Sequence, residues 1–215
     1  MKNIACLVSV PRLKVFTLLL ALATAWNLSA GQAELASALG EARDELLRTR
    51  DQLQATVDAL DALAKQKGGD MRPTYDTFVA EVSKTESAAA VTKQRARKMQ
   101  ADAGMHFGSW QKDIDTISNE SLRKKAQSRF NDVQKRYDKV VASLNKASDR
   151  FTPFISDLND IQKMLANDLT PGGVKAIRGT VSQAKWNLRS VRSAIFDASK
   201  ELERMEKSLG TVAPK

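Results

Sequence analysis

A stripe of apolar residues, spaced alternately three and four positions apart, runs from Leu35 to Leu209 with few interruptions. This spacing keeps one face of an α-helix apolar along its length, and it is typical of long helices that pack side by side as in coiled coils. In the last part of the chain the stripe consists of Val174, Ile177, Val181, Ala184, Leu188, Val191, Ile195, Ala198, Leu202, Met205 and Leu209. The pattern predicts an all-α fold and specifies no reaction.

Turn-forming residues divide the stripe into four segments, at Gly68-Gly69, Ser118-Asn119 and Thr170-Pro171. The expected helices cover about residues 33–67, 71–117, 120–168 and 171–209. Pro153 lies inside the third segment, where the stripe continues in register, so we expect a bend there and not an end. Together these helices form a single domain of residues 31–209, followed by a frayed tail at 210–215.

Short connections between the predicted helices force neighbours in the sequence to run in opposite directions. The expected architecture is an elongated antiparallel up-down-up-down four-helix bundle with coiled-coil-type packing. At 1.5 Å per residue the second and third helices are each about 70 Å long, longer than the other two. The first and fourth helices therefore leave the turn at residues 118–119 less covered than the rest.

The N-terminal segment, residues 1–30, has the features of an export signal. Basic residues precede an apolar run from Val15 to Ala23, and small residues follow it. The run is short of the roughly twenty residues that a membrane-spanning helix needs. We expect cleavage after Ala30 or Ala33 and a periplasmic or otherwise extracytoplasmic location. The alternative is an uncleaved segment that holds the protein in the inner membrane.

Residue types that support catalysis or metal binding are scarce in this chain. A di-metal site in a helical bundle needs two Glu-x-x-His pairs, but the chain has one histidine, His106, and Ala103 stands three residues before it. The one cysteine, Cys6, lies in the signal, and no nucleophile elbow or phosphate-binding glycine loop is present. We therefore predict no enzyme activity, catalytic residue, metal or cofactor. Because His106 falls on the apolar stripe, we expect an interior or boundary histidine whose hydrogen bonds are satisfied.

A basic edge follows the last segment of the stripe, one position after its apolar residues, and comprises Lys175, Arg178, Lys185, Arg189 and Arg192. As an exposed surface it would bind anionic lipid, polysaccharide or another phosphate-bearing partner. The alternative, which we favour, is internal pairing with acidic residues of the first helix, namely Glu41, Asp44, Asp51 and Asp58. Nucleic acid is disfavoured as a partner by the export signal and by the lack of aromatic residues interleaved among the basic ones.

Bulky apolar residues beside two glycines form a second candidate surface near the turn at residues 118–119. This docking tip comprises Met105, Phe107 and Trp110, with Gly104 and Gly108 next to them. An exposed tip would dock on a partner or a membrane. The alternative, which we favour, is a kink packed under the end of the bundle.

From Ile117 to about Arg178 the chain resembles a family of uncharacterised bacterial exported helical proteins, domain-of-unknown-function family 2959. The resemblance rests on Ile117-Ser118-Asn119 followed by Leu122-Arg123, then Arg136-Tyr137, Pro153 with its apolar neighbours, and Leu165 leading to Ala176-Ile177. It implies a helical extracytoplasmic protein with no assigned activity, cofactor or catalytic residue. The resemblance also implies a lipid-attachment cysteine after the signal in many members, and this chain lacks one.

The sequence supports three functional hypotheses. The first is a non-catalytic structural or interaction module of the cell envelope, with a protein partner or with self-association through its heptad seams. The second is binding of anionic lipid or polysaccharide through the basic edge. The third is a membrane-active helical bundle that opens to expose its seam.

Overall fold

The computed structural model describes the backbone of residues 14–210 and the side chains of residues 31–209. These residues form five helices and no strand, namely α1 (Lys14–Lys65), α2 (Arg72–Asp115), α3 (Glu120–Asn167), α4 (Pro171–Ala176) and α5 (Arg178–Gly210). The predicted all-α class is therefore confirmed. Of the predicted signal, residues 1–13 lie outside the described residues, and so do residues 211–215 of the predicted tail at 210–215, whereas Gly210 is the last residue of α5. Helix α1 begins at Lys14 and runs without a break through both predicted cleavage sites.

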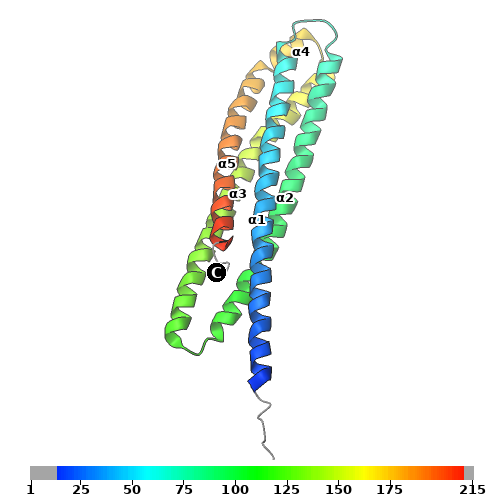
Figure 1. The fold of residues 1–215 in the computed structure, drawn as a ribbon. Coiled ribbons are helices and arrows are strands. Elements are labelled where there is room, and N and C mark those ends of the chain that lie inside the picture. The colour runs from blue at the N-terminus through cyan, green and yellow to red at the C-terminus, as the bar shows by residue number, and fades with distance from the viewer. Residues whose placement is uncertain (1–13, 211–215) are drawn as a thin grey trace, which may run out of the picture.

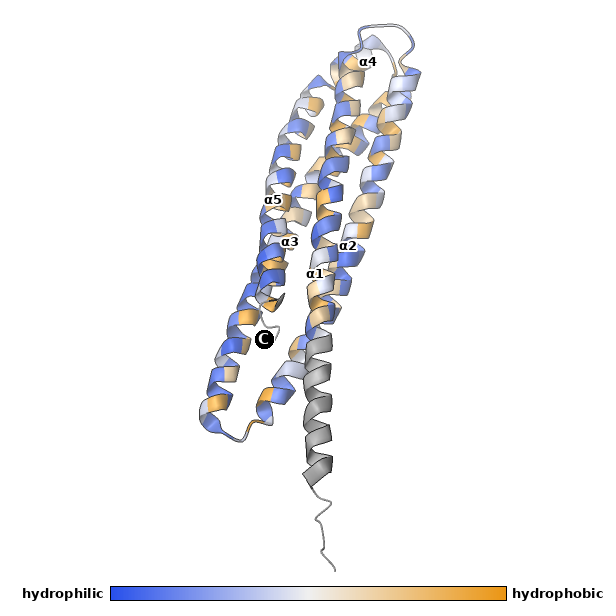
Figure 2. Cartoon of the chain, in the orientation of Figure 1, coloured by the Kyte–Doolittle hydropathy of each residue, from blue (hydrophilic) through white to orange (hydrophobic). Residues whose placement is uncertain are grey.

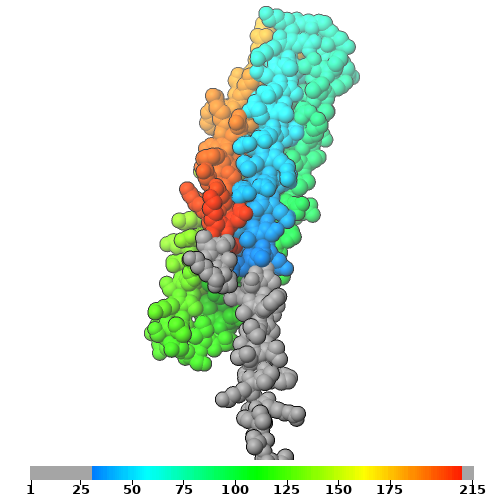
Figure 3. Space-filling view, viewed as in Figure 1, coloured from blue at the N-terminus to red at the C-terminus, as the bar shows by residue number. Residues whose placement is uncertain are grey.

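Helices α1, α2, α3 and α5 are long, and they lie side by side in an elongated molecule (Figure 1). Helix α1 packs against α2 and α5, and α3 packs against α5 and, less extensively, against α2. Within the described residues, no Cα atom of α1 lies within 8 Å of one in α3, and none of α2 lies within 8 Å of one in α5, so the helices of each pair are not direct neighbours. The space-filling view in Figure 3 shows the joined ends of α2 and α3, in green, extending past the end of α5.

The apolar stripe forms the core. Every stripe residue from Val174 to Leu209 is buried, and the stripe residues of α1, from Leu35 to Leu63, are buried as well. Figure 2 shows the same division, with hydrophobic residues recurring along each helix between hydrophilic ones. Burial of this apolar area is the main force that holds the helices together.

Helix ends follow local chemistry. Gly69, after α1, has a φ of 78°, a left-handed conformation that suits glycine. At the start of α3 the Asn119 side chain accepts a hydrogen bond from the Leu122 backbone N–H at 3.1 Å. Helix α3 passes through Pro153 without ending, so the register of the stripe outweighs the hydrogen bond that the proline removes.

The predicted helix at 171–209 is two helices in the structure, and Ile177 separates α4 from α5. The Thr170 side chain caps α4 by accepting a hydrogen bond from the Gly173 backbone N–H at 3.2 Å. A Cβ atom at Gly173 would lie 2.0 Å from the Asp168 carbonyl oxygen, so this tight turn requires glycine. Glycine also weakens a helix, which explains why the first turns form a short separate element.

Candidate functional site

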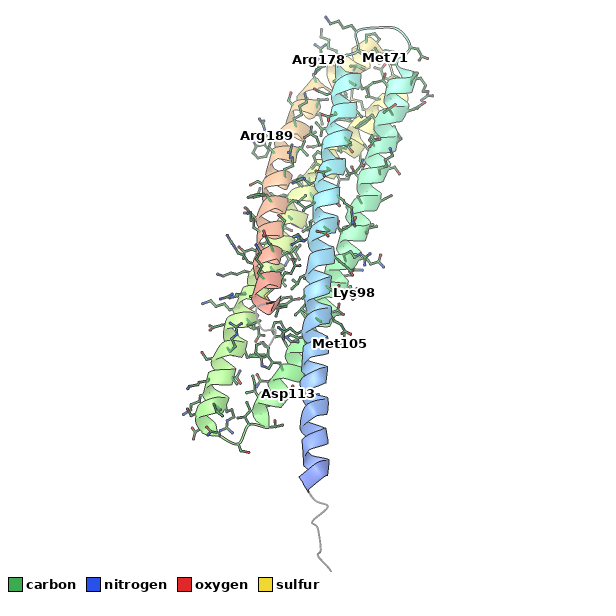
Figure 4. The ribbon with its side chains drawn as sticks, in the orientation of Figure 1. Met71, Lys98, Met105, Asp113, Arg178 and Arg189 are labelled. Atoms are coloured by element: carbon green, nitrogen blue, oxygen red, sulfur yellow. The ribbon has the colours of Figure 1, made fainter. Side chains whose placement is uncertain are left out.

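The predicted basic edge runs along α4 and α5. Its five residues divide by exposure: Lys185 is half-buried, and Lys175, Arg178, Arg189 and Arg192 are exposed. Figure 4 shows Arg178 near the junction of α4 and α5, and Arg189 on the outer side of α5. The edge therefore has an inner part, toward α1, and an outer part, toward solvent.

The inner part of the edge holds α5 against α1. Lys185 forms an ion pair with Asp61, and Arg192 donates a hydrogen bond from Nη1 to Oε1 of Gln54 at 2.6 Å. The hydrogen bond from Lys185 lowers the pKa of Asp61, and Lys65 contributes in the same direction. These two basic residues therefore have partners within the protein.

The predicted acidic partners of the edge were wrong, although the predicted partner helix was right for Lys185 and Arg192. Glu41 pairs with Arg95 of α2 at 2.7 Å. The other three pair within α1: Asp44 with Arg43 at 3.3 Å, Asp51 with Arg50 at 2.8 Å, and Asp58 accepts a hydrogen bond from Gln54 at 2.8 Å.

The register between α1 and α5 explains this difference for Glu41. Arg43, early in the described part of α1, forms an ion pair with Glu206, late in α5, at 2.7 Å, while Asp61, late in α1, reaches Lys185, early in α5. Glu41 lies two residues before Arg43, so it is opposite the last turns of α5. The basic edge has already ended there, at Arg192.

The outer part of the edge consists of three cations, Lys175, Arg178 and Arg189. No side-chain nitrogen of these three residues forms a hydrogen bond or an ion pair with any residue whose side chain is described. Trp186 lies between Lys185 and Arg189 in sequence and is 56% exposed. We call Lys175, Arg178, Trp186 and Arg189 the outer α5 face.

Sequence reasoning missed Trp186. The statement that no aromatic residue interleaves the basic ones was wrong, because Trp186 falls outside the apolar stripe and next to Lys185. Phe196, further along α5, is 55% exposed, and the Lys200 Nζ atom lies 5.5 Å from the centre of its ring. A search for large apolar residues outside the stripe would have found both aromatic residues.

The docking tip is only partly a surface. Met105 is 64% exposed, but Phe107 is buried and Trp110 is half-buried. The Phe107 ring centre lies 5.7 Å from that of Phe130 and 5.5 Å from that of Tyr137, and Trp110 lies 5.3 Å from Phe130. Since α3 covers Phe107 through these aromatic contacts, Phe107 does not offer a docking surface.

His106 lies at the edge of the same aromatic cluster, 5.7 Å from Trp110 between ring centres. It is buried, as predicted, but its Nε2 atom has no hydrogen-bond partner among the described residues, contrary to the prediction of a histidine whose hydrogen bonds are satisfied. Burial lowers the pKa of His106 because it disfavours the charged imidazolium. Helix α1 passes close by: a Cβ atom at Gly31 would lie 3.7 Å from Nδ1 of His106.

No three His, Cys, Asp or Glu side chains of the described residues gather closely enough to hold a metal ion. Within residues 14–210, no helix combines the length and apolar character needed to cross a membrane.

Comparison with known proteins places the chain in a family. No curated protein matches it. The family described as "Protein of unknown function (DUF2959)" matches residues 32–208, which is most of the chain and includes all of the α2, α3 and α4 residues. This match extends well beyond the stretch from Ile117 to Arg178 on which the sequence resemblance rested. The chain therefore belongs to the DUF2959 family.

Proposed function

We propose that this DUF2959 protein is a non-catalytic, extracytoplasmic interaction module of the cell envelope. In this proposal the long helices form an antiparallel four-helix bundle, with α4 and α5 together as the fourth member, and the bundle presents one helix face to a partner. The single observation that carries the proposal is the outer α5 face. There, three cations whose side chains pair with no described residue accompany an exposed tryptophan.

The chemistry of this face favours an anionic lipid surface as the partner. Basic residues near an anionic membrane each contribute about 1 kcal/mol of attraction, and tryptophan is enriched at the level of lipid headgroups. Lys175, Arg178 and Arg189 provide the charge, and Trp186 provides the amphipathic ring. Polysaccharide offers anionic groups but no apolar layer for Trp186, so lipid fits the combination better.

Co-sedimentation with vesicles tests this proposal. We expect the protein to bind vesicles that contain phosphatidylglycerol and not vesicles of phosphatidylcholine alone, with binding that weakens as salt rises. The double variant Arg178→Glu/Arg189→Glu should lower the affinity about tenfold or more, because two attractive charges become repulsive. Trp186→Ala should weaken binding less and leave its salt dependence unchanged.

The matched control is Arg129→Glu/Arg136→Glu, which makes the same charge change at two exposed positions of α3. It should retain vesicle binding. Equal losses in the two double variants would mean that net charge alone drives adsorption, and this would overturn the outer α5 face as the site. Binding to an acidic polysaccharide but not to vesicles would overturn lipid as the partner.

Export is a separate part of the proposal. A periplasmic fraction of cells that express the full chain should contain a protein whose N-terminus, determined by mass spectrometry, is Gly31 or Glu34. Intact residues 1–30 on a membrane-bound protein would instead favour the uncleaved anchor.

A further inference from the structure

A cleft opens between α2 and α3 near the middle of the molecule. Its volume is about 470 Å³, within the range of roughly 300–1,000 Å³ that small-molecule sites occupy. The floor comes from the other two long helices and is mainly apolar, with Leu46 from α1 and Val191 and Ile195 from α5, all three buried. The buried Thr49 of α1 also lines it, and its hydroxyl is hydrogen-bonded to that of Thr92. The cleft therefore reaches the core of the molecule.

Small side chains on α2 leave this space unfilled. Ala89 and Ala96, which line the cleft, occupy core positions of the α2 stripe but are only half-buried. Earlier on the same stripe stands Phe78, and after it stands Met99, and both are fully buried. The side chains of α3 do not fill the space that Ala89 and Ala96 leave, because Phe151 of α3 remains half-buried beside the cleft. The gap follows from side-chain volume and not from a break in the helices.

Two cations stand at the mouth of the cleft. Lys93 and Arg97, one helical turn apart on α2, are exposed and line the opening. Neither forms a hydrogen bond or ion pair with a described side chain, whereas their neighbours Arg95 and Lys98 each pair with a carboxylate at 2.7 Å. Among the described residues that line the cleft there is no Asp or Glu. An apolar floor thus lies beneath a mouth of uncompensated positive charge.

We propose that the cleft binds a fatty-acid anion, with its single alkyl chain on the apolar floor and its carboxylate between Lys93 and Arg97. The apolar floor selects an alkyl chain, since each buried methylene should tighten binding about fourfold. The cations select a negative headgroup by charge complementarity. The modest volume selects one chain in preference to the two of a membrane phospholipid. This site is separate from the outer α5 face, because its mouth lies on α2 and α3.

Displacement of a fluorescent fatty-acid probe tests the proposal. The probe is dansylaminoundecanoate, whose emission rises in apolar surroundings, and the competitors are decanoate, dodecanoate and tetradecanoate below their micelle concentrations. We expect displacement to strengthen with chain length. Dodecanoate should compete at least about tenfold better than dodecanol and better still than dodecyltrimethylammonium. A soluble short-chain phosphatidylglycerol, which carries two alkyl chains, should compete poorly.

Two variants test the floor and the mouth separately. Ala96→Leu fills the cleft and should weaken dodecanoate binding at least about tenfold, while Ala101→Leu, at an exposed position of the same helix, should not. Lys93→Glu/Arg97→Glu should weaken dodecanoate about tenfold and reduce its advantage over dodecanol. The matched control is Lys135→Glu/Lys139→Glu, an exposed pair with the same spacing on α3. Circular dichroism checks that each variant remains helical.

Three results would overturn the inference. The first is unchanged probe binding in Ala96→Leu, and the second is equal competition by dodecanoate and dodecyltrimethylammonium. The third is a wild-type dimer, seen by analytical ultracentrifugation, that Ala96→Leu converts to a monomer while no probe binds, since a second copy would then occupy the cleft. Arg178→Glu/Arg189→Glu should bind dodecanoate normally, so a failure of vesicle binding leaves this test intact.

Discussion

Helix α2 makes two interfaces that differ in closure, although one continuous stripe serves both. Toward α1 the interface is extensive, and toward α3 it is thin and contains the cleft. Two phenylalanines of α3 show the contrast over three residues: Phe154 is fully buried, and Phe151 lies half-buried at the cleft. The period of the stripe decides which side of a helix faces inward. The size of the stripe residues decides whether facing helices meet.

The largest expected effect comes from the two phenylalanines. Phe154→Ala should lower the free energy of unfolding by about 3–5 kcal/mol, because it removes a fully buried ring and leaves a cavity. Phe151→Ala should cost less, about 1–2 kcal/mol, since part of its side chain is already exposed at the cleft. Urea denaturation followed by circular dichroism measures both values. Equal losses would mean that the cleft closes in solution.

A pair of alanines one heptad apart on α2 gives effects of opposite sign. Ala103 is fully buried, so Ala103→Leu should lower the free energy of unfolding by about 1–3 kcal/mol through overpacking. Ala96 borders the cleft, so Ala96→Leu should raise it by about 0.5–2 kcal/mol, because the new side chain covers apolar floor. Melting temperatures of the two variants and the wild type test these opposite changes in stability. A loss in Ala96→Leu would contradict an empty cleft.

The sequence predicts which side of each helix faces inward, but it does not predict how neighbouring helices are aligned. The stripe in α5 was predicted residue by residue, because helical period is a local property that neighbouring positions determine. The register between helices is not local. Nothing in the sequence near Lys185 indicates Asp61 as its partner, and the predicted acidic residues lie elsewhere for that reason.

The local sequence also does not show which side chains a helix distant in the chain covers. Phe107 looked available beside two glycines, but Phe130 and Tyr137 from α3 cover it. The cleft, in contrast, had a local signal that was not used. Ala89 and Ala96 are small residues at core positions of the stripe, where large apolar residues are usual. A sum of side-chain volumes along the stripe would have predicted the cleft.

Two threonine pairs between α1 and α2 provide a smaller test. The Thr56 and Thr85 hydroxyls lie 2.7 Å apart and both residues are fully buried, whereas Thr92, which pairs with Thr49 at 2.8 Å, lies at the cleft. Thr85→Val should lower the free energy of unfolding by about 1–2 kcal/mol, because the buried Thr56 hydroxyl loses its bond to Thr85 and keeps only backbone carbonyl acceptors. Thr92→Val should change it by less than about 0.5 kcal/mol, because water in the cleft can replace the lost bond.

Equilibrium denaturation in urea compares the two valine variants. The midpoint of Thr85→Val should fall and that of Thr92→Val should stay near the wild-type value, with equal slopes for all three proteins. A larger loss of unfolding free energy in Thr92→Val than in Thr85→Val would show that the cleft contains no water. This result would contradict a cleft whose mouth is open and lined by hydrated cations.

The smallest expected effect on stability comes from His106 of α2. Its imidazole is buried at the edge of the aromatic cluster that joins α2 and α3, and we call this region the closed end of the α2–α3 interface. Burial lowers the pKa of His106 in the folded state below the ordinary value of 6.5. As pH falls through 6.5, the unfolded chain gains a proton that the folded chain does not, so the free energy of unfolding falls with it. The melting temperature should therefore be lower at pH 5.5 than at pH 7.5.

Melting temperatures at pH 7.5 and pH 5.5 therefore test whether the α2–α3 pair is closed at His106. His106→Leu should show a smaller decrease between these two pH values than the wild type. Carboxylates such as Asp61 and Glu81 contribute little over this interval, because ion pairing and hydrogen bonding lower their pKa values further below it. If both proteins lose the same stability, then His106 takes up its proton in the folded state and water reaches the imidazole. The closed end of the interface would then be as open as the cleft, and side-chain volume along α2 could not be what distinguishes them.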